Sequence, residues 1–176
     1  MYQISWNEGS LNKFYSKMNN LIKSLENGIR EATEQSCKNV QQLALNNKRG
    51  TKDETMIPYE VEQLSKGVFQ GKIHTDKDKF PYASFLEYGT GTLAEREHIG
   101  TTKTFIESGY RYWYLPVEKV GNKLNNTVIS INGTLFYVMH PTQPFPFMRP
   151  AGFQSRENTI KIMKNKLKDS LKGAIK

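Results

Sequence analysis

Four prolines within ten residues constrain this chain more than any other feature of its sequence. They stand at positions 141, 144, 146 and 150, within the segment 141–151, PTQPFPFMRPA. Each proline fixes its own φ angle and disfavours the helical region for the residue before it. Because proline also lacks a backbone N–H, such a segment can give few hydrogen bonds to a sheet. We therefore expect this proline-rich segment to be stiff and non-helical, running along an edge or over a surface, anchored by Phe145, Phe147 and Met148.

A second constrained segment lies about fifty residues earlier, at 81–90, PYASFLEYGT. Pro81 suits the start of a short helix, and Gly89 suits a left-handed cap at its end. On such a helix Phe85 and Tyr88 share one side while Glu87 points elsewhere. Three roles stay open for Glu87: it ties down a backbone amide, it pairs with a basic residue of a neighbouring subunit, or it is an ordinary exposed carboxylate.

The two segments, taken together and in this order, resemble the head–tail connector family of tailed bacteriophages. These are small neck or tail-completion proteins, typified by the tenth gene product of a lambdoid phage. The similarity also covers the layout, with a long helix before the first motif and another straight after the second. Between the motifs the chain departs from the family, because the insertion 91–133 stands where many members have a short connection. The matching residues are Tyr82, Ala83, Leu86, Glu87, Gly89, Thr90, Pro146, Phe147, Arg149, Pro150 and Ala151.

The resemblance implies a structural protein without enzymatic activity, located at the head–tail junction of a virion or phage-like particle. It would form a neck, tail-completion or tail-terminator ring, a hexamer or alternatively a dodecamer, assembled in the cytoplasm of a bacterial host. Its partners would be further copies of itself and the adjacent head-completion and tail-tube proteins. The residues expected to contact them are Tyr82, Phe85, Glu87, Gly89, Thr90, Pro146, Phe147, Arg149 and Pro150.

Composition limits the possible classes of protein independently of the resemblance. A length of 176 residues fits one domain, 1–176, and a mean hydropathy of −0.64 predicts much polar surface. No stretch approaches the eighteen or so apolar residues of a membrane span, and the first residues lack the pattern of a secretory signal, so we expect synthesis in the cytoplasm. The single cysteine, Cys37, has no partner for an internal disulfide, and its position predicts a small packing residue.

A long helix is predicted over 10–46, with Ser10 as its N-cap. It would reach about 54 Å, more than a compact domain of this size needs. Either it breaks, with Gly28 as the weak point, or part of it packs against a neighbouring subunit. The spacing of its apolar stripe is also that of a coiled coil, although flanking charge pairs are scarce. The stripe comprises Leu11, Tyr15, Met18, Ile22, Leu25, Ile29, Ala32, Ser36, Val40 and Leu43.

The remaining patterns complete an α+β fold. A polar loop is expected at 47–55, strands at 67–75 and 109–115, and a hairpin at 126–139 around Asn132-Gly133, which favours a type I′ turn. The result is an antiparallel sheet of about four strands, with the N-terminal helix and a C-terminal helix packed on one face. That second helix, 155–172, would bury Ile160, Met163, Leu167 and Leu171. The irregular stretch 91–108 is predicted to be a loop that becomes ordered on another subunit.

Motifs for chemistry are weak, so no catalytic residue, metal site or cofactor is predicted. The three histidines lie far apart in sequence, and Glu95, Glu97 and His98 fall in the irregular stretch, where a charged cluster is usually solvated. Gly89-Thr-Gly91 lacks the third glycine and the strand-to-helix context of a dinucleotide site.

Nucleic-acid binding is the alternative function. Of the net charge of +8, the range 156–176 carries +5, from seven Lys or Arg against Glu157 and Asp169. The strand 110–114 places Tyr110, Tyr112 and Tyr114 on one face, where aromatic rings beside basic residues could stack on bases. The competing interpretation of the basic range is a solvated helix face. For the strand it is that one aromatic face fills the core while the other packs against a helix or a neighbour.

Overall fold

The structure is a computed structural model that describes residues 8–90, 93, 112–120 and 124–175. It divides into two compact units. Unit 1 comprises Met1–Gln41, Tyr59–Ile73 and Gln154–Lys176, and unit 2 comprises Gln42–Pro58 and His74–Phe153. The expectation of a single domain over 1–176 stays a prediction.

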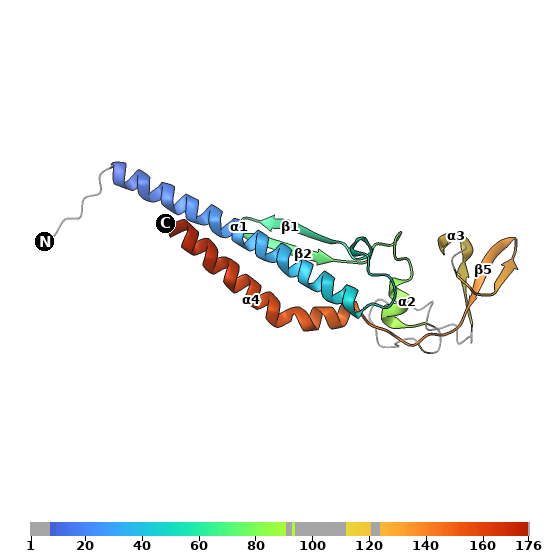
Figure 1. Ribbon diagram of the computed structural model, residues 1–176. Coiled ribbons are helices and arrows are strands. Elements are labelled where there is room, and N and C mark those ends of the chain that lie inside the picture. The colour runs from blue at the N-terminus through green and yellow to red at the C-terminus, as the bar shows by residue number, and fades with distance from the viewer. Residues whose placement is uncertain (1–7, 91–92, 94–111, 121–123, 176) are drawn as a thin grey trace. The chain divides into compact units, whose positions relative to one another are not determined.

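The elements confirm the α+β class, with a long N-terminal helix, a C-terminal helix and antiparallel strands (Figure 1). In the described part of the chain their order is α1 (Glu8–Asn47), the short 3₁₀ helix η1 (Glu54–Met56), β1 (Tyr59–Ser65), β2 (Val68–Ile73), α2 (Ala83–Tyr88), β3 (Trp113–Pro116), α3 (Val117–Val120), β4 (Val128–Ile131), β5 (Thr134–Met139) and α4 (Met148–Ile175).

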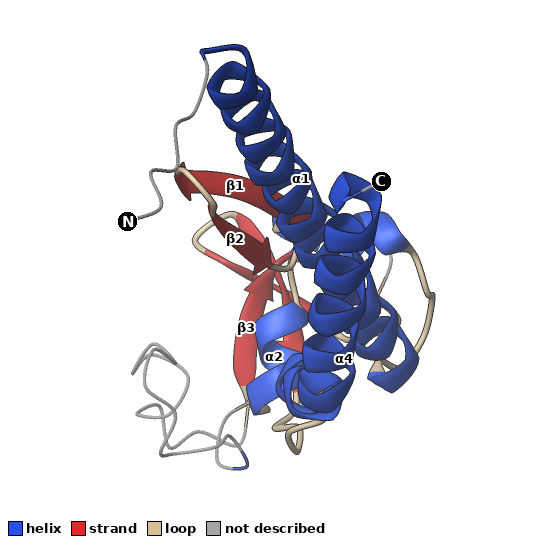
Figure 2. Ribbon diagram, turned by 90° about the vertical axis from the view of Figure 1, so that its left-hand side faces the viewer, coloured by secondary structure: helices blue, strands red, loops and turns tan. Residues whose placement is uncertain are grey.

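In unit 1, helix α1 lies between the β1–β2 hairpin on one side and α4 on the other (Figures 1 and 2). The hairpin is antiparallel, and Tyr59 pairs with Ile73 at its open end. Its second strand approaches α1 closely at Gly71, where an added Cβ would meet Cys37 Sγ and would lie 3.3 Å from Thr33 Cγ2. Cys37 is buried, as expected of a packing residue, and burial raises the pKa of its thiol.

The packing of α1 against α4 explains Gly28. A Cβ at this position would meet the side chain of Ser170, and Ser24 Oγ donates a hydrogen bond to the Ser170 carbonyl oxygen at 3.1 Å. Nearby, Lys166 Nζ lies 3.0 Å from Glu31 Oε2. Helix α1 does not break at Gly28, so the predicted weak point is wrong: the missing side chain lets the two helices approach.

The predicted apolar stripe of α1 is buried over only part of its length. Ala32 and Ser36 are buried, whereas the four stripe residues nearest the N-terminus are 38–58% exposed. Within the described chain nothing covers them fully, although the helix itself runs unbroken from Glu8. These four residues are Leu11, Tyr15, Met18 and Ile22.

In unit 2, three antiparallel strands form a sheet in the order β3-β5-β4. The predicted hairpin between β4 and β5 is confirmed, with Asn132 and Gly133 at φ angles of 51° and 80°, as a type I′ turn requires. Leu115 and Tyr137 pair across β3 and β5 and are buried. Among the described residues of this unit, the other large buried apolar side chains are Leu45, Ile57, Phe80 and Phe147.

The expected sheet of about four strands is instead two sheets, of two and three strands. The strand near residue 70 pairs with β1, which the sequence patterns did not suggest, and so it does not join the sheet of unit 2. The C-terminal helix also begins earlier than residue 155, because 148–151 of the proline-rich segment form its first turn. On that helix Ile160 and Leu171 are 56% and 40% exposed, contrary to the burial expected for them.

Some expectations fall outside the described residues. These are the loop 91–108 apart from Leu93, the strand residues 109–111 with Tyr110, and the possible metal cluster at Glu95, Glu97 and His98. Among the helices that the structure describes, none is long and apolar enough to span a bilayer.

Candidate functional site

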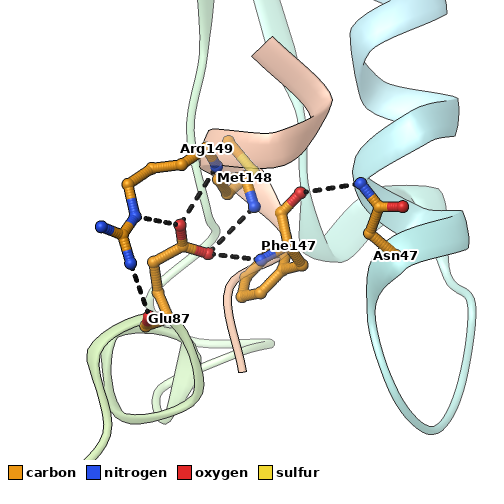
Figure 3. Close-up of polar contacts among 5 residues, drawn as sticks. All are labelled: Asn47, Glu87, Phe147, Met148 and Arg149. Atoms are coloured by element: carbon orange, nitrogen blue, oxygen red, sulfur yellow. Dashed lines mark hydrogen bonds and ion pairs between the residues drawn. The ribbon is translucent and has the colours of Figure 1, made fainter. Parts of the chain in front are cut away.

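The two motifs meet inside unit 2, where Glu87 of helix α2 faces the start of helix α4 (Figure 3). The carboxylate accepts hydrogen bonds from three consecutive backbone amides. Phe147 N and Met148 N lie 2.7 and 2.9 Å from Glu87 Oε2, and Arg149 N lies 3.1 Å from Oε1. Of the three roles left open for Glu87, the structure therefore shows the first, in which it ties down backbone amides.

This arrangement caps α4 from a distance. The first N–H groups of a helix have no partner within the helix, and a residue such as Ser or Asp just before it usually satisfies one of them. Here Phe147 occupies that place, so a carboxylate sixty residues away supplies the acceptor. Pro150, the third residue of α4, has no N–H to satisfy, and proline is tolerated in a first turn. The non-helical prediction for the proline-rich segment therefore holds for 141–147 and is wrong for 148–151.

Charge reinforces the hydrogen bonds. The helix dipole places partial positive charge at the start of α4, which favours a carboxylate there. Arg149 adds a full charge: its Nε lies 3.1 Å from Glu87 Oε1, and its Nη2 donates to the Glu87 backbone oxygen at 3.3 Å. The guanidinium also lies 5.1 Å from the centroid of the Tyr88 ring. Glu87 is only 4% exposed, so these interactions take place largely away from water.

The carboxylate of Glu87 is fully engaged. Its two oxygens accept four hydrogen bonds in all, which matches the number of acceptor positions that a carboxylate offers. A carboxylate committed in this way cannot also serve as a general base without breaking the start of α4. Glu87 is therefore a structural residue of this site.

Gly89 and Thr90 hold the other end of the first motif to the proline-rich segment. Thr90 N donates to the Thr142 carbonyl oxygen and Thr142 N donates to Thr90 Oγ1, each at 2.9 Å, while Phe145 N donates to the Leu86 carbonyl oxygen at 2.7 Å. Together with the three amides that bind Glu87, five of the N–H groups that the prolines leave in this segment are bound to residues 86–90. The non-helical part of the segment, the strap 141–147, is thereby fixed against α2.

Gly89 is required on two grounds. Its φ of 75° and ψ of −174° fall in a region that is almost restricted to glycine. A Cβ built there would lie 2.6 Å from the Thr142 carbonyl oxygen and 2.8 Å from Pro144 N, and these backbone atoms cannot turn aside.

A buried aromatic pair supports the strap from the inside. The Phe147 ring is 1% exposed and its centroid lies 5.6 Å from that of Phe80, which is equally buried. Lys48 places its ammonium 4.7 Å from the Phe80 centroid and donates to the carbonyl oxygens of Arg49 and Thr51. Burial lowers the pKa of Lys48, while nearby Asp53 acts in the opposite direction.

Lys48 and Asn47 are the residues of this region that sequence reasoning missed, because both were assigned to a polar loop. Asn47 Nδ2 donates to the Phe147 carbonyl oxygen at 3.5 Å. The available signal was position: a lysine directly after the last turn of a helix is well placed to bind free carbonyl oxygens. The end of the predicted loop also differs, since 54–56 form η1, where Thr55 N donates to Asp53 Oδ1.

All nine predicted contact residues lie in unit 2, but they differ in accessibility. Glu87, Gly89, Thr90 and Phe147 are buried within the unit, and Tyr82 is 39% exposed. The other four, Phe85, Pro146, Arg149 and Pro150, are partly exposed. Tyr82, Phe85 and Thr90 line an open, largely apolar groove of about 630 Å³, together with Arg49 and Phe145. Contact of any of the nine with another subunit stays a prediction.

Comparison of the chain with protein-family models, with curated proteins and with solved structures gives no match. In the part of the chain that the structure describes, no three His, Cys, Asp or Glu side chains are grouped as metal ligands.

Replacing Glu87 with alanine should lower the free energy of unfolding by about 3–5 kcal/mol, because three amides and the Arg149 guanidinium lose their acceptor. Glu87→Gln keeps the shape but loses the charge and some acceptor capacity, so we expect a smaller loss of about 1–3 kcal/mol. Glu157→Ala removes an exposed carboxylate from α4 and should change stability by no more than about 0.5 kcal/mol. Urea unfolding curves of the three variants test this order; equal effects of Glu87→Ala and Glu157→Ala would contradict the proposed cap.

The role of Gly89 is tested by comparison with Gly50, which also has a positive φ, of 82°, but has no atom within 4 Å of an added Cβ. Gly50→Ala should lower the free energy of unfolding by only about 1–2 kcal/mol, the cost of holding alanine at a positive φ. Gly89→Ala should cost at least about 2 kcal/mol more, because its methyl group overlaps the backbone of the strap. Thermal unfolding of both variants provides the measurement, and similar losses of stability would show that close approach is not what requires glycine.

Proposed function

We propose that this chain is a structural protein of a tailed phage or phage-like particle, which assembles as a ring at the head–tail junction. The neck, tail-completion and tail-terminator positions all fit this proposal. One observation carries it: residues from both halves of the family-like motif form one connected set in unit 2, joined through Glu87. Two motifs fifty residues apart that hold each other in place are what a shared fold-defining core would require.

The chemistry of the site fits a protein that works by assembly. Glu87 and Arg149 form an ion pair with each other, and both also bind backbone groups. The site therefore offers a rigid strap rather than a reactive group. Rigid docking surfaces bind with less loss of conformational freedom than mobile ones. In this proposal the buried residues of the motif set the position of the strap, and the exposed ones, such as Tyr82 and Phe85, meet neighbouring subunits.

The test is to delete the gene in a strain that produces the particle and to image the products by negative-stain electron microscopy. We expect separate heads and tails, or tails of abnormal length, and restoration of normal particles by the wild-type gene on a plasmid. Glu157→Ala should restore them as well, whereas Glu87→Ala should not. Normal, infectious particles from the deletion strain would rule out this function.

Nucleic-acid binding remains a second candidate because of one observation. Tyr114 in β3 and Tyr112 directly before this strand are 51% and 46% exposed, so both rings are accessible to a partner. Exposed rings of this kind can stack on unpaired bases.

Titration with single-stranded DNA at two salt concentrations separates the candidates. A DNA-binding role predicts micromolar binding that weakens steeply as the salt concentration rises. The double variant Tyr112→Ala/Tyr114→Ala should then bind more weakly than the wild type at both salt concentrations. A purely assembling role predicts no such binding by the wild type.

A further inference from the structure

The first half of α1 carries an apolar stripe that the described residues of its unit leave partly uncovered. Leu11, Tyr15, Met18 and Ile22 are 39%, 58%, 40% and 38% exposed, and Phe14 beside them is 50% exposed. Ser170 of α4 lies against Gly28, and α4 is described only as far as Ile175, about 8 Å further along. Figure 1 shows α1 extending past this end of α4. About twenty ångströms of helix, from Glu8 onward, therefore have no neighbouring helix among the residues of the unit that the structure describes.

The stripe has the spacing of a seam between helices. From Leu11 to Ser36 its residues alternate in steps of four and three, which is the repeat of a coiled coil. Further along, at Ala32 and Ser36, the same stripe is buried within unit 1. The exposed half therefore continues a line of residues that is already used for packing.

Charge indicates what kind of partner the exposed half accepts. All three lysines of its first turns, Lys13, Lys17 and Lys23, fall at the outer positions of the repeat, away from the seam. The positions that flank the seam hold Asn12, Phe14, Asn19 and Leu21, which carry no charge. From Leu11 to Ile22 two copies can therefore approach along the seam without like charges meeting there; Glu8, seven residues before Tyr15, is the one charged residue of the segment at a seam position. Phe14 and Leu21 also widen the apolar stripe, which gives a second helix more surface to cover.

We propose that residues 8–22 of α1 associate with the same segment of another copy of this chain. The seam spans about fifteen residues, fewer than the roughly 20–30 a side of a standard stable interface, so the contact by itself is weak and depends on concentration. The proposal goes beyond the assignment to a particle and stands on α1 alone. It would survive if the particle assignment failed, and the particle assignment would survive if this contact failed.

Sedimentation velocity across a wide range of protein concentration tests the proposal, with the wild type compared to Tyr15→Ser/Met18→Ser and Leu11→Ser/Phe14→Ser. The wild type should associate reversibly. Each double variant should need a concentration about a hundredfold higher, since it truncates two apolar side chains, in the seam or beside it, at about tenfold each. The matched control is Lys13→Ser/Lys17→Ser, which alters two outer positions of the same segment and should associate as the wild type does.

Circular dichroism at low concentration separates loss of association from loss of folding. The truncated residues are already 39–58% exposed in the single chain, so the variants should keep the helical signal of the dilute wild type. A wild type that stays monomeric at all concentrations would overturn the proposal, and so would seam variants that associate as readily as the lysine control.

Discussion

The contact between the Glu87 carboxylate and the first amides of α4 organises unit 2. It joins α2, the strap 141–147 and the start of α4 through one side chain, and it does so where water is excluded. Each partner depends on the others. Without the carboxylate, the first turn of α4 has free amides; without those amides and Arg149, a charged group would be buried alone, which is costly. Gly89 and the buried ring of Phe147 then fix the geometry of these hydrogen bonds.

Local patterns in the sequence predicted local structure well. The stripe with three- and four-residue spacing indicates the long helix, and Asn132-Gly133 indicates the hairpin, because each signal depends on neighbours in sequence. Pairing between distant segments leaves no such signal. The strand near residue 70 shows this: its alternation is visible, but nothing in it says that β1 is its partner, and one sheet was therefore expected where there are two.

The site shows the same division. Glu87, Gly89, Phe147 and Arg149 stood out because they match a motif, but the role of Glu87 could not be decided from sequence. The sequence does not distinguish a glutamate that is a buried acceptor from one that is an exposed carboxylate. Only the placement of the α4 amides distinguishes the two roles. Exposure on helix surfaces was also hard to predict. The stripe on α1 keeps the same spacing from Leu11 to Ser36, yet its burial depends on where α4 ends.

The distant cap has a bearing on how the chain between the two motifs can vary. Because Glu87 and the strap hold residues 90 and 142 together, the intervening chain leaves and returns at one fixed place. The entropy lost in closing such a loop grows only logarithmically with its length, by roughly 0.6 kcal/mol for each doubling. Within 91–133, the connections outside β3 and β4 can therefore lengthen or shorten over evolution with little penalty to unit 2, which makes them a natural place for related chains to acquire features of their own.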